Sequence, residues 1–389
     1  MFKDISVIDL STGIAGPYCT KILSDLGANV IKVEPPEGEI TRFSEPYYSG
    51  DVDPNKSIKF SFLNTNKKSI TLDLFTPKGN SLVKNLIRTV KPYLIVESYG
   101  PEVLDKIGLD FNTIKSINGF TSLISISNFG STGPYRSYKA HEMNIQAISG
   151  LMSITGEPDL EPLIAGADIA QLNGGQVAAL SALTYMFQAM TTSSGTHSDV
   201  SLMEANMDLL ENWMLGQFQG ELMPRRGKQH QSGFPSEVYP CADGYVSVNA
   251  SPGSWSELAE LMEAPDLDRE EYYERSSRPK YRDQIEPLMT DWLTQNNKRE
   301  IFHGAQKRRL AFSYIANARD LLESDQLTDR NFFSTIGPNT HPGTPFKIRS
   351  SIAENKEAPG LGEHNQEIYK DLLGLSKDDI LSLSAEKVI

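Results

Sequence analysis

Two positions in the middle of the chain carry residue types that can do covalent or acid–base chemistry. Asp168 stands directly before a long apolar segment, so it is a candidate for the residue that caps a helix. A carboxylate in that position is kept ionised by the helix dipole, and an ionised carboxylate can act as a nucleophile. His141 is followed by Glu142 in front of a second apolar segment, which makes both candidate acid–base groups. The residue types leave two interpretations of Asp168 open, a helix cap or a nucleophile, and they leave open whether His141 packs, orients a substrate or moves a proton.

A glycine-containing loop near the N-terminus is a candidate site for a phosphate or an acyl group. The segment 11–17 (STGIAGP) follows a strand-like run and precedes a helix-like one. Its glycine spacing is G-x-x-G, and not the G-x-G-x-x-G of dinucleotide-binding folds, so a nicotinamide enzyme lacks support. The N–H groups at the start of a helix can nevertheless bind an anion. The six histidines show no metal-ligand spacing and no G-x-S-x-G or Walker motif is present, so no metal is expected.

An alternation of strands and helices near the N-terminus would position these residues. Strand-like runs cover 5–10, 29–33, 69–74, 93–97 and 123–126, and helix-like runs cover 17–26 and 81–90. This alternation predicts a parallel sheet with crossover helices, that is, a Rossmann-like α/β fold in which ligands bind beyond the carboxyl ends of the strands. The segment 169–190 is apolar nearly all round and rich in small residues, so we expect a buried helix there.

The rest of the chain predicts a second, smaller domain. The expected division is a large Rossmann-like domain over 1–200, a linker over 201–235 and a small α+β domain over 236–329. The small domain would begin with a hairpin at 237–249, because alternating residues flank an Ala-Asp-Gly turn there. The tail, 330–389, is expected to return to the large domain and complete it.

The charge balance excludes some classes of partner. The chain carries 37 basic and 50 acidic residues, a net charge of −13, which repels nucleic acids and anionic membranes. No run of apolar residues is long enough to span a bilayer, and the N-terminus does not resemble a signal peptide. The two cysteines fit a reducing compartment, so the expected location is the cytoplasm. Any anionic ligand must be held by local cations and N–H groups.

Several separated stretches resemble the family III CoA-transferases, the CaiB/BaiF family, which includes formyl-CoA transferase, carnitine CoA-transferase and the α-methylacyl-CoA racemases. The order and spacing of these stretches carry the resemblance, because no single motif is decisive. The resemblance implies an interlocked homodimer, in which each chain has a Rossmann-like large domain built from both chain ends and a small domain. The matching stretches are 9–17 (DLSTGIAGP), 26–34 (LGANVIKVE), 66–74 (NKKSITLDL), 96–109 (VESYGPEVLDKIGL), 129–134 (FGSTGP), 149–158 (SGLMSITGEP), 195–203 (GTHSDVSLM), 241–246 (CADGYV) and 345–347 (PFK).

The resemblance also implies an activity, the transfer of CoA between an acyl-CoA donor and a carboxylic acid acceptor. Asp168 would attack the donor thioester to form an aspartyl–acyl anhydride, and the CoA thiolate would convert the anhydride into an aspartyl–CoA thioester. CoA and acyl-CoA are then substrates, and no permanently bound cofactor is expected. The racemase branch is the alternative, because it uses a His/Asp acid–base pair and this chain has His141 and Asp168. Glu142 stands where that branch has an aspartate, which favours the transferase.

The CoA-binding positions carried over from the family lie mostly in loops that follow strands. Lys106 and Lys139 would supply positive charge for the phosphates, and the adenine would rest near Leu72. Arg42 is added for its charge and is not carried over from the family. Ile14 stands where formyl-CoA transferases have a glutamine, so a larger or more apolar acyl group than formate or oxalate is expected. The full set is Thr12, Gly13, Ile14, Ala15, Arg42, Leu72, Ser98, Tyr99, Lys106 and Lys139.

Overall fold

The chain forms two compact units. The computed structural model describes residues 2–48, 50–210, 216, 218, 220, 224–230, 232–250, 253–347 and 355–389. The larger unit comprises Met1–Leu151, Ile164–Leu215 and Asn331–Ile389, and the smaller unit comprises Met152–Leu163 and Gly216–Arg330. Residues 152–163, which the sequence assigned to the large domain, thus group with the smaller unit, and the expected linker falls partly outside the described residues.

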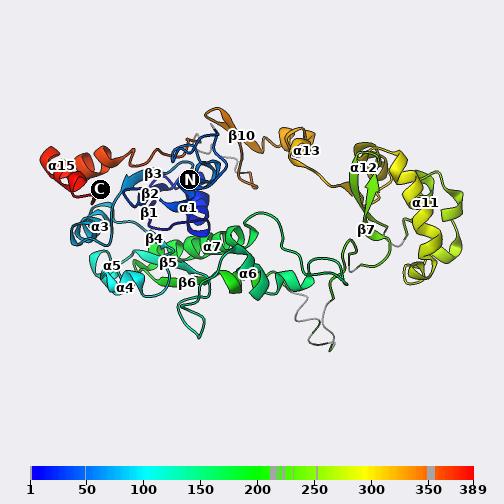
Figure 1. Ribbon diagram of the computed structural model, residues 1–389, viewed down its shortest axis with the longest axis horizontal. Coiled ribbons are helices and arrows are strands. Elements are labelled where there is room, and N and C mark those ends of the chain that lie inside the picture. Colours follow the sequence, from blue (N-terminus) through cyan, green and yellow to red (C-terminus); the bar gives the residue numbers. More distant parts are fainter. Residues whose placement is uncertain are drawn as a thin grey trace. The chain divides into compact units, whose positions relative to one another are not determined.

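A parallel sheet is the centre of the larger unit (Figure 1). Within the described residues it has six strands in the order β3-β2-β1-β4-β5-β6, which is the Rossmann order, so the predicted fold class is confirmed. The order reverses between β1 and β4, and a crevice is expected there at the carboxyl ends of the strands. The strands are β1 (Ser6–Asp9), β2 (Asn29–Glu34), β3 (Lys68–Thr71), β4 (Leu94–Glu97), β5 (Ser122–Ser127) and β6 (His197–Ser201).

Helices cover both faces of this sheet because its strands are apolar on both sides. Val7 and Ile8 are neighbours in β1 with no exposed surface, yet they belong to two different hydrophobic clusters. The cluster of Val7 includes residues of α1 (Ala15–Asp25) and α7 (Ile169–Thr192). The cluster of Ile8 includes residues of α3 (Pro77–Val90), α5 (Phe111–Ile117), η6 (Gln366–Leu372) and α15 (Lys377–Ala385). The tail of the chain thus packs on the sheet beside helices from its beginning.

The helix α7 is buried on one face in the single chain, so the prediction of a buried helix holds for that face and not for the opposite one. Small residues such as Gly174, Gly175 and Ala178 form the buried face. A Cβ at Gly175 would lie 2.6 Å from the carbonyl oxygen of Ala15, so glycine lets α1 and α7 pack closely. On the other side, Leu180 and Phe187 are 67% and 68% exposed.

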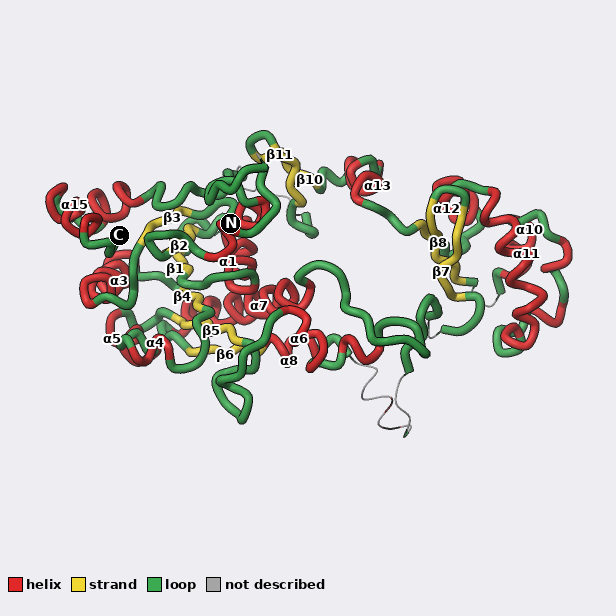
Figure 2. Tube along the Cα trace, in the orientation of Figure 1, coloured by secondary structure: helices red, strands yellow, loops and turns green. Residues whose placement is uncertain are grey.

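The smaller unit combines a short antiparallel sheet with helices (Figure 2). The hairpin predicted at 237–249 is confirmed as β7 and β8, which pair antiparallel from Ser236–Asn249 to Cys241–Gly244. One hydrophobic cluster joins the hairpin to the helices, and it includes Trp255, which is 1% exposed. The elements are β7 (Ser236–Cys241), β8 (Gly244–Asn249), α10 (Trp255–Leu261), η3 (Pro265–Leu267), η4 (Glu270–Tyr272), η5 (Arg278–Tyr281), α11 (Arg282–Gln295), α12 (Lys298–Lys307), β9 (Ser313–Tyr314), α13 (Ala318–Leu322) and α14 (Asp325–Asp329).

Short elements complete the chain between the main ones. They are η1 (Ile40–Phe43), α2 (Ile58–Leu63), α4 (Val103–Lys106), α6 (Glu142–Ile148), η2 (Leu151–Ile154), α8 (Leu202–Met207), β10 (Phe333–Ile336) and β11 (Asn339–Pro342). Within the described part of the chain, no helix has both the length and the apolar character needed to cross a membrane.

Candidate functional site

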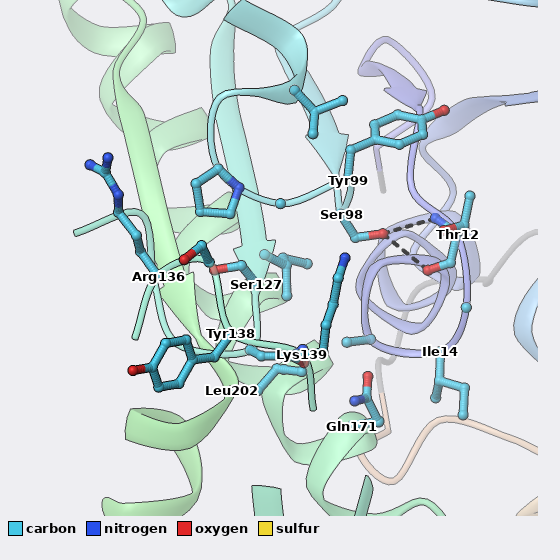
Figure 3. Close-up of a pocket in the computed structure, with 18 residues that line it drawn as sticks. Thr12, Ile14, Ser98, Tyr99, Ser127, Arg136, Tyr138, Lys139, Gln171 and Leu202 are labelled. Carbon is cyan, nitrogen blue, oxygen red and sulfur yellow. Dashed lines mark hydrogen bonds between the residues drawn. The ribbon is translucent and has the colours of Figure 1, made fainter. Parts of the chain in front are cut away.

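A cavity of about 440 Å³, here called the switch-point cavity, lies at the carboxyl edge of the sheet where the strand order reverses (Figure 3). The loops that follow β1, β4 and β5 line it, as expected for a ligand site in such a sheet. Seven of the ten expected CoA-binding residues come together in its wall. They are Thr12, Gly13, Ile14, Ala15, Ser98, Tyr99 and Lys139.

The first loop is tied to the neighbouring loop by hydrogen bonds. The N–H of Thr12 donates to Oγ of Ser98 at 2.9 Å, and this hydroxyl donates to the Thr12 carbonyl oxygen at 3.0 Å. The N–H of Gly13 donates to Oε2 of Glu39 at 3.1 Å, and its φ of +77° suits glycine. These two N–H groups are already used. An anion at this end of α1 would meet the N–H groups of Ala15 and Gly16, because Pro17 has no N–H and the N–H of Tyr18 donates to the Ile14 carbonyl oxygen at 2.9 Å.

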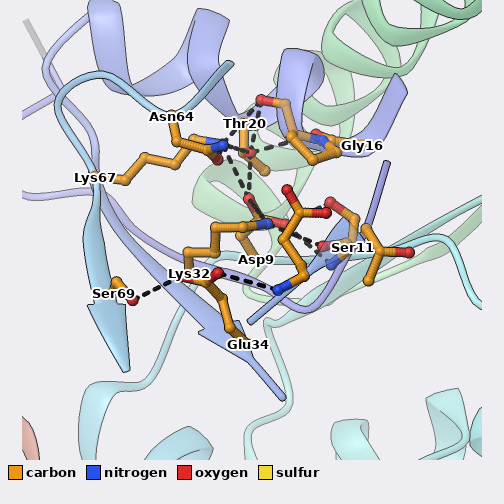
Figure 4. Close-up of polar contacts among 12 residues, drawn as sticks. Asp9, Ser11, Gly16, Thr20, Lys32, Glu34, Asn64, Lys67 and Ser69 are labelled. Atoms are coloured by element: carbon orange, nitrogen blue, oxygen red, sulfur yellow. Dashed lines mark hydrogen bonds and ion pairs between the residues drawn. The ribbon is translucent and has the colours of Figure 1, made fainter. Parts of the chain in front are cut away.

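A buried ionic network holds the first loop from beneath (Figure 4). The Asp9 carboxylate accepts hydrogen bonds from the Ser11 N–H at 3.0 Å, the Thr20 hydroxyl at 2.6 Å and Nζ of Lys67 at 3.1 Å. Nζ of Lys32 donates to the Ser11 carbonyl oxygen at 3.0 Å. Burial alone would raise the pKa of Asp9, but Lys32 and Lys67 hold it far below its usual range. The carboxylate therefore stays ionised and fixes the backbone that begins the cavity wall.

Three expected CoA-binding residues lie outside the cavity lining. The prediction for Arg42 is wrong, because this buried side chain donates to both Glu34 carboxylate oxygens, at 2.6 and 2.8 Å, and has no N–H left for a phosphate. The side chain of Leu72 is 2% exposed within the core, and the adenine slot predicted near it stays a prediction. Lys106 is exposed at the end of α4. The other acceptors of Arg42 are the carbonyl oxygens of Pro54 and Pro359 and the amide oxygen of Asn55.

Asp168 holds the expected position before α7, but its side chain does not cap the helix. The Glu142 carboxylate caps it instead, accepting the N–H of Ala170 at 2.8 Å and of Gln171 at 3.0 Å. The capping function predicted for the Asp168 side chain is therefore wrong, and this carboxylate is available for other contacts. It accepts a hydrogen bond from Nζ of Lys59 at 2.9 Å, and each of the two side chains is 34% exposed.

Asp168 precedes the helical turn that reaches the switch-point cavity, and it follows a constrained residue. Gln171, one helical turn further along α7, lines the cavity. Ala167 has a φ of +62°, a left-handed conformation that costs a residue with a side chain about 1–2 kcal/mol. Such local strain at a residue next to a charged group is typical of functional sites. The backbone of Asp168 is thus constrained by the preceding Ala167, and its carboxylate is held by the ion pair with Lys59.

His141 begins α6 and lies directly before the capping Glu142. Its N–H donates to Oδ1 of Asn144 at 3.0 Å, and its side chain is exposed. The hydrogen bond to Asn144 therefore fixes the backbone of His141, and the catalytic role predicted for its imidazole ring stays a prediction.

Sequence reasoning missed several residues of the site. Arg136 and Tyr138 line the cavity from the loop after β5, and the Arg136 guanidinium pairs with Glu102 at 3.0 Å. Ligands in such sheets bind beyond the carboxyl ends of the strands, and β5 lies next to β4, so the loop after β5 could have been predicted as part of the site. Lys59 gave no such signal, because 109 residues separate it from Asp168. The lining residues missed include Ser127, Asn128, Arg136, Tyr138 and Gln171.

A second cavity of about 480 Å³, lined by Glu97, Asp105, Asp110, Asp199 and His197 among others, shares part of its wall with the first. We call it the acidic cavity. Burial, helped by Asp199 and Asp105, raises the pKa of Glu97 to about 7. Its Oε2 accepts the N–H of Tyr99 at 2.8 Å, so Glu97 links the acidic cavity to a residue that lines the switch-point cavity. The described residues contain no group of three or more side chains suited to hold a metal ion.

Glu97→Gln is expected to remove a pH dependence of stability. The Glu97 carboxyl ionises near pH 4.5 in the unfolded chain and near 7 in the folded one, so the folded state binds more protons between these values. Stability therefore falls as pH rises through this window, by about 3 kcal/mol in total. Glutamine does not titrate, so the variant should be more stable than the wild type at pH 8 and should lose the slope.

The measurement is the urea midpoint of unfolding at several pH values from 5 to 8. Glu300→Gln, at an exposed glutamate, is the matched control and should keep the wild-type slope. A slope that survives unchanged in Glu97→Gln would show that another group causes it.

Comparisons with known proteins agree on one family. The model of CoA-transferase family III matches residues 2–365. The chain is 32% identical to the formyl-CoA:oxalate CoA-transferase of Streptomyces coelicolor, over 100% of this chain and 98% of that protein. It is 31% identical to the succinyl-CoA–D-citramalate CoA-transferase of Chloroflexus aurantiacus, over 99% and 97% of the two chains. The crystal structure of a CaiB/BaiF family protein from Brucella suis is similar with a TM-score of 0.86 at 28% identity, covering 95% of this chain and 98% of that one.

Proposed function

The chain belongs to CoA-transferase family III, and on this premise we propose that it transfers coenzyme A from an acyl-CoA donor to a carboxylic acid with Asp168 as the nucleophile. One observation carries the proposal: the Asp168 carboxylate is not used as a helix cap, is partly exposed and is paired with a cation. A carboxylate in this state can attack a thioester. Its place before the first turn of α7, which lines the switch-point cavity, supports the same reading.

The proposed reaction proceeds by four exchanges at carbonyl carbons. The Asp168 carboxylate attacks the donor thioester, the C–S bond breaks, and a mixed anhydride and CoA thiolate form. The thiolate attacks the Asp168 carbonyl, which releases the donor acid as a carboxylate and leaves an aspartyl–CoA thioester. The acceptor carboxylate then attacks this thioester, and the thiolate finally attacks the acceptor carbonyl of the new anhydride. Asp168 is restored as a carboxylate, and no proton is gained or lost in the sum.

The CoA moiety is proposed to lie in the switch-point cavity. The Lys139 side chain extends its ammonium group into the cavity toward Ser98 (Figure 3). With the first turn of α1, it offers the phosphates a local positive field within a chain of net charge −13. The exposed ring of Tyr138 in the same wall offers a flat apolar surface for the adenine. Lys106, on the exposed end of α4, is retained as a further phosphate contact.

The acyl group is proposed to be larger than formyl. Ile14 lines the cavity with an aliphatic side chain, which favours contact with methylene groups over hydrogen bonding to a small acid. Among the relatives, the citramalate enzyme is named for a succinyl donor, whereas the Streptomyces enzyme is named for formyl and oxalate. The proposed class is therefore acyl-CoA esters and acids with a carbon chain of a few atoms.

We also propose that the chain works as an interlocked homodimer. The exposed apolar side of α7, where Leu180 and Phe187 are more than half exposed, is a surface that a second copy would cover. Burial of these residues would account for a sequence that is apolar nearly all round the helix.

The test is an exchange assay with a panel of acyl-CoA donors and carboxylic acids, in which mass spectrometry follows new acyl-CoA species. The same protein is incubated with a 2-methylacyl-CoA in deuterated water, because the racemase alternative would exchange the α-hydrogen through His141 and Asp168. We expect new acyl-CoA species without deuterium at the α-carbon. Deuterium exchange without any transfer would instead establish the racemase.

A further inference from the structure

The net charge of the Lys59–Asp168 ion pair changes during the proposed reaction, because acylated Asp168 has no negative charge. This change indicates a second role for the lysine. We propose that Lys59 binds the reacting carboxylate of the acceptor acid once Asp168 has become a CoA thioester. The inference rests on the proposed function, because it needs the Asp168 thioester.

The position of Lys59 is fixed by the short helix that carries it. α2 begins after Ser57, whose Oγ accepts the N–H of Phe60 at 3.3 Å and lies 2.7 Å from the carbonyl oxygen of Thr41. Phe60 is 2% exposed, so the helix is anchored in the interior on that side. Lys59, the neighbour of Phe60, keeps 34% of its side chain exposed and directs Nζ to Asp168. The backbone that carries Lys59 is thus placed by packing that does not depend on the ion pair.

Charge balance gives the second step. In the free enzyme the positive charge of Lys59 and the negative charge of Asp168 compensate each other at 2.9 Å. Conversion of the aspartate to an anhydride or a thioester removes the negative charge, whereas the ammonium group stays charged. Among the described residues, Lys59 forms its ion pair with the carboxylate of Asp168. Acylation of Asp168 therefore leaves the lysine without its counter-charge. A carboxylate that enters the site restores the balance.

The distance between Lys59 and Asp168 would place that carboxylate beside the carbon with which it reacts. Nζ of Lys59 lies within hydrogen-bond distance of Oδ2 of Asp168, and in the thioester this position belongs to the carbonyl group or its sulfur. An acceptor oxygen held by Nζ is therefore next to the carbon it must attack. Attack forms the C–O bond and breaks the C–S bond, and the thiolate leaves with the electron pair. When the thiolate takes the acceptor acyl group, Asp168 leaves as a carboxylate and pairs with Lys59 again.

The experiment separates the two half-reactions in the full-length protein. Wild type, Lys59→Met and Lys59→Arg are each incubated with an acyl-CoA, and the Asp168–CoA adduct is quantified by mass spectrometry. An acceptor acid found in the exchange assay is then added at increasing concentration, and the loss of the adduct is followed. Lys56→Met is the matched control, because Lys56 lies on the same stretch of chain but pairs with Asp53 at 3.2 Å.

We expect Lys59→Met to form the adduct and to need about 10- to 100-fold more acceptor for half-maximal turnover, which corresponds to the loss of one hydrogen bond to a charged group. Lys59→Arg should recover most of this loss, and Lys56→Met should match the wild type. An unchanged acceptor requirement in Lys59→Met would overturn the inference and leave the proposed function standing. Failure of Lys59→Met to form the adduct would overturn it too, by assigning the lysine to the first half-reaction. Absence of the adduct from the wild type during turnover would refute the proposed function itself.

Discussion

Asp168→Ala is expected to abolish the transfer of coenzyme A, with kcat lower by at least about 10⁴-fold. Removal of a covalent nucleophile stops the route through the enzyme-bound intermediate, and losses of this size follow when such a residue is removed from other enzymes. Asp168→Asn should be nearly as inactive, because an amide oxygen is a far weaker nucleophile than a carboxylate. Both variants are measured in the exchange assay with saturating donor and acceptor.

The loss should be chemical and not a loss of the fold. The ion pair of Asp168 with Lys59 is partly exposed, so its removal should change the free energy of unfolding by less than about 1 kcal/mol. Urea unfolding of the two variants checks this, and Asp291→Ala, at an exposed aspartate of α11, controls for the substitution itself. Transfer that continues in Asp168→Ala at more than one tenth of the wild-type rate would remove Asp168 from the mechanism.

The fold was predictable because the strands of the sheet are buried on both faces. Runs such as 29–33 and 93–97 are short, apolar and β-branched, and only a sheet covered by helices on both sides can bury them. The family resemblance pointed to Thr12–Ala15 and Ser98–Tyr99, and the sheet topology brings these two loops together at the carboxyl edge, where they line part of the switch-point cavity.

The misjudged charged residues share a physical cause, which is that a sequence shows a charge and not its partner. Arg42 was expected to meet a phosphate, but Glu34 neutralises it inside the core. Glu142, whose part in the chemistry stays a prediction, holds the first turn of α7 with its carboxylate, and the position of Asp168 depends on that helix. Lys59 was overlooked for the converse reason, since its partner lies far away in the sequence. Short-range patterns cannot supply such pairings.

Asp9→Asn is expected to lower the free energy of unfolding by about 3–5 kcal/mol, the largest stability effect in the molecule that we predict. The carboxylate has no exposed surface, and its removal leaves Lys32 and Lys67 buried without a counter-charge. The asparagine keeps an oxygen for the Ser11 N–H, but its amide group would face Nζ of Lys67, a donor against a donor. The measurement is the urea midpoint at pH 7, with Asp291→Asn as the control.

The pH dependence of this loss identifies its origin. Because the pKa of Asp9 in the folded state is far below its usual range, its contribution is fully present above the unfolded value of about 4 and is lost as pH falls further. The difference between wild type and Asp9→Asn should therefore narrow below pH 4. The stability difference between wild type and Asp9→Asn should also narrow at high pH. Burial lowers the pKa of Lys67 to about 8, and without Asp9 this lysine loses its proton still more readily. A neutral Lys67 no longer needs the counter-charge of Asp9.

A double variant tests whether the unpaired lysine is the cause. In Asp9→Asn/Lys67→Met the buried positive charge of Lys67 is gone, so the double variant should be more stable than Asp9→Asn alone. If the two sites were independent, the losses of stability of the two single variants would add, and the double variant would be the less stable one. The same network holds the carbonyl and N–H groups of Ser11 beneath the cavity wall, so Asp9→Asn should also weaken acyl-CoA binding in calorimetry. If the double variant is less stable than Asp9→Asn by the full cost of Lys67→Met, the two charges are not coupled, and the loop is held by its hydrogen bonds alone.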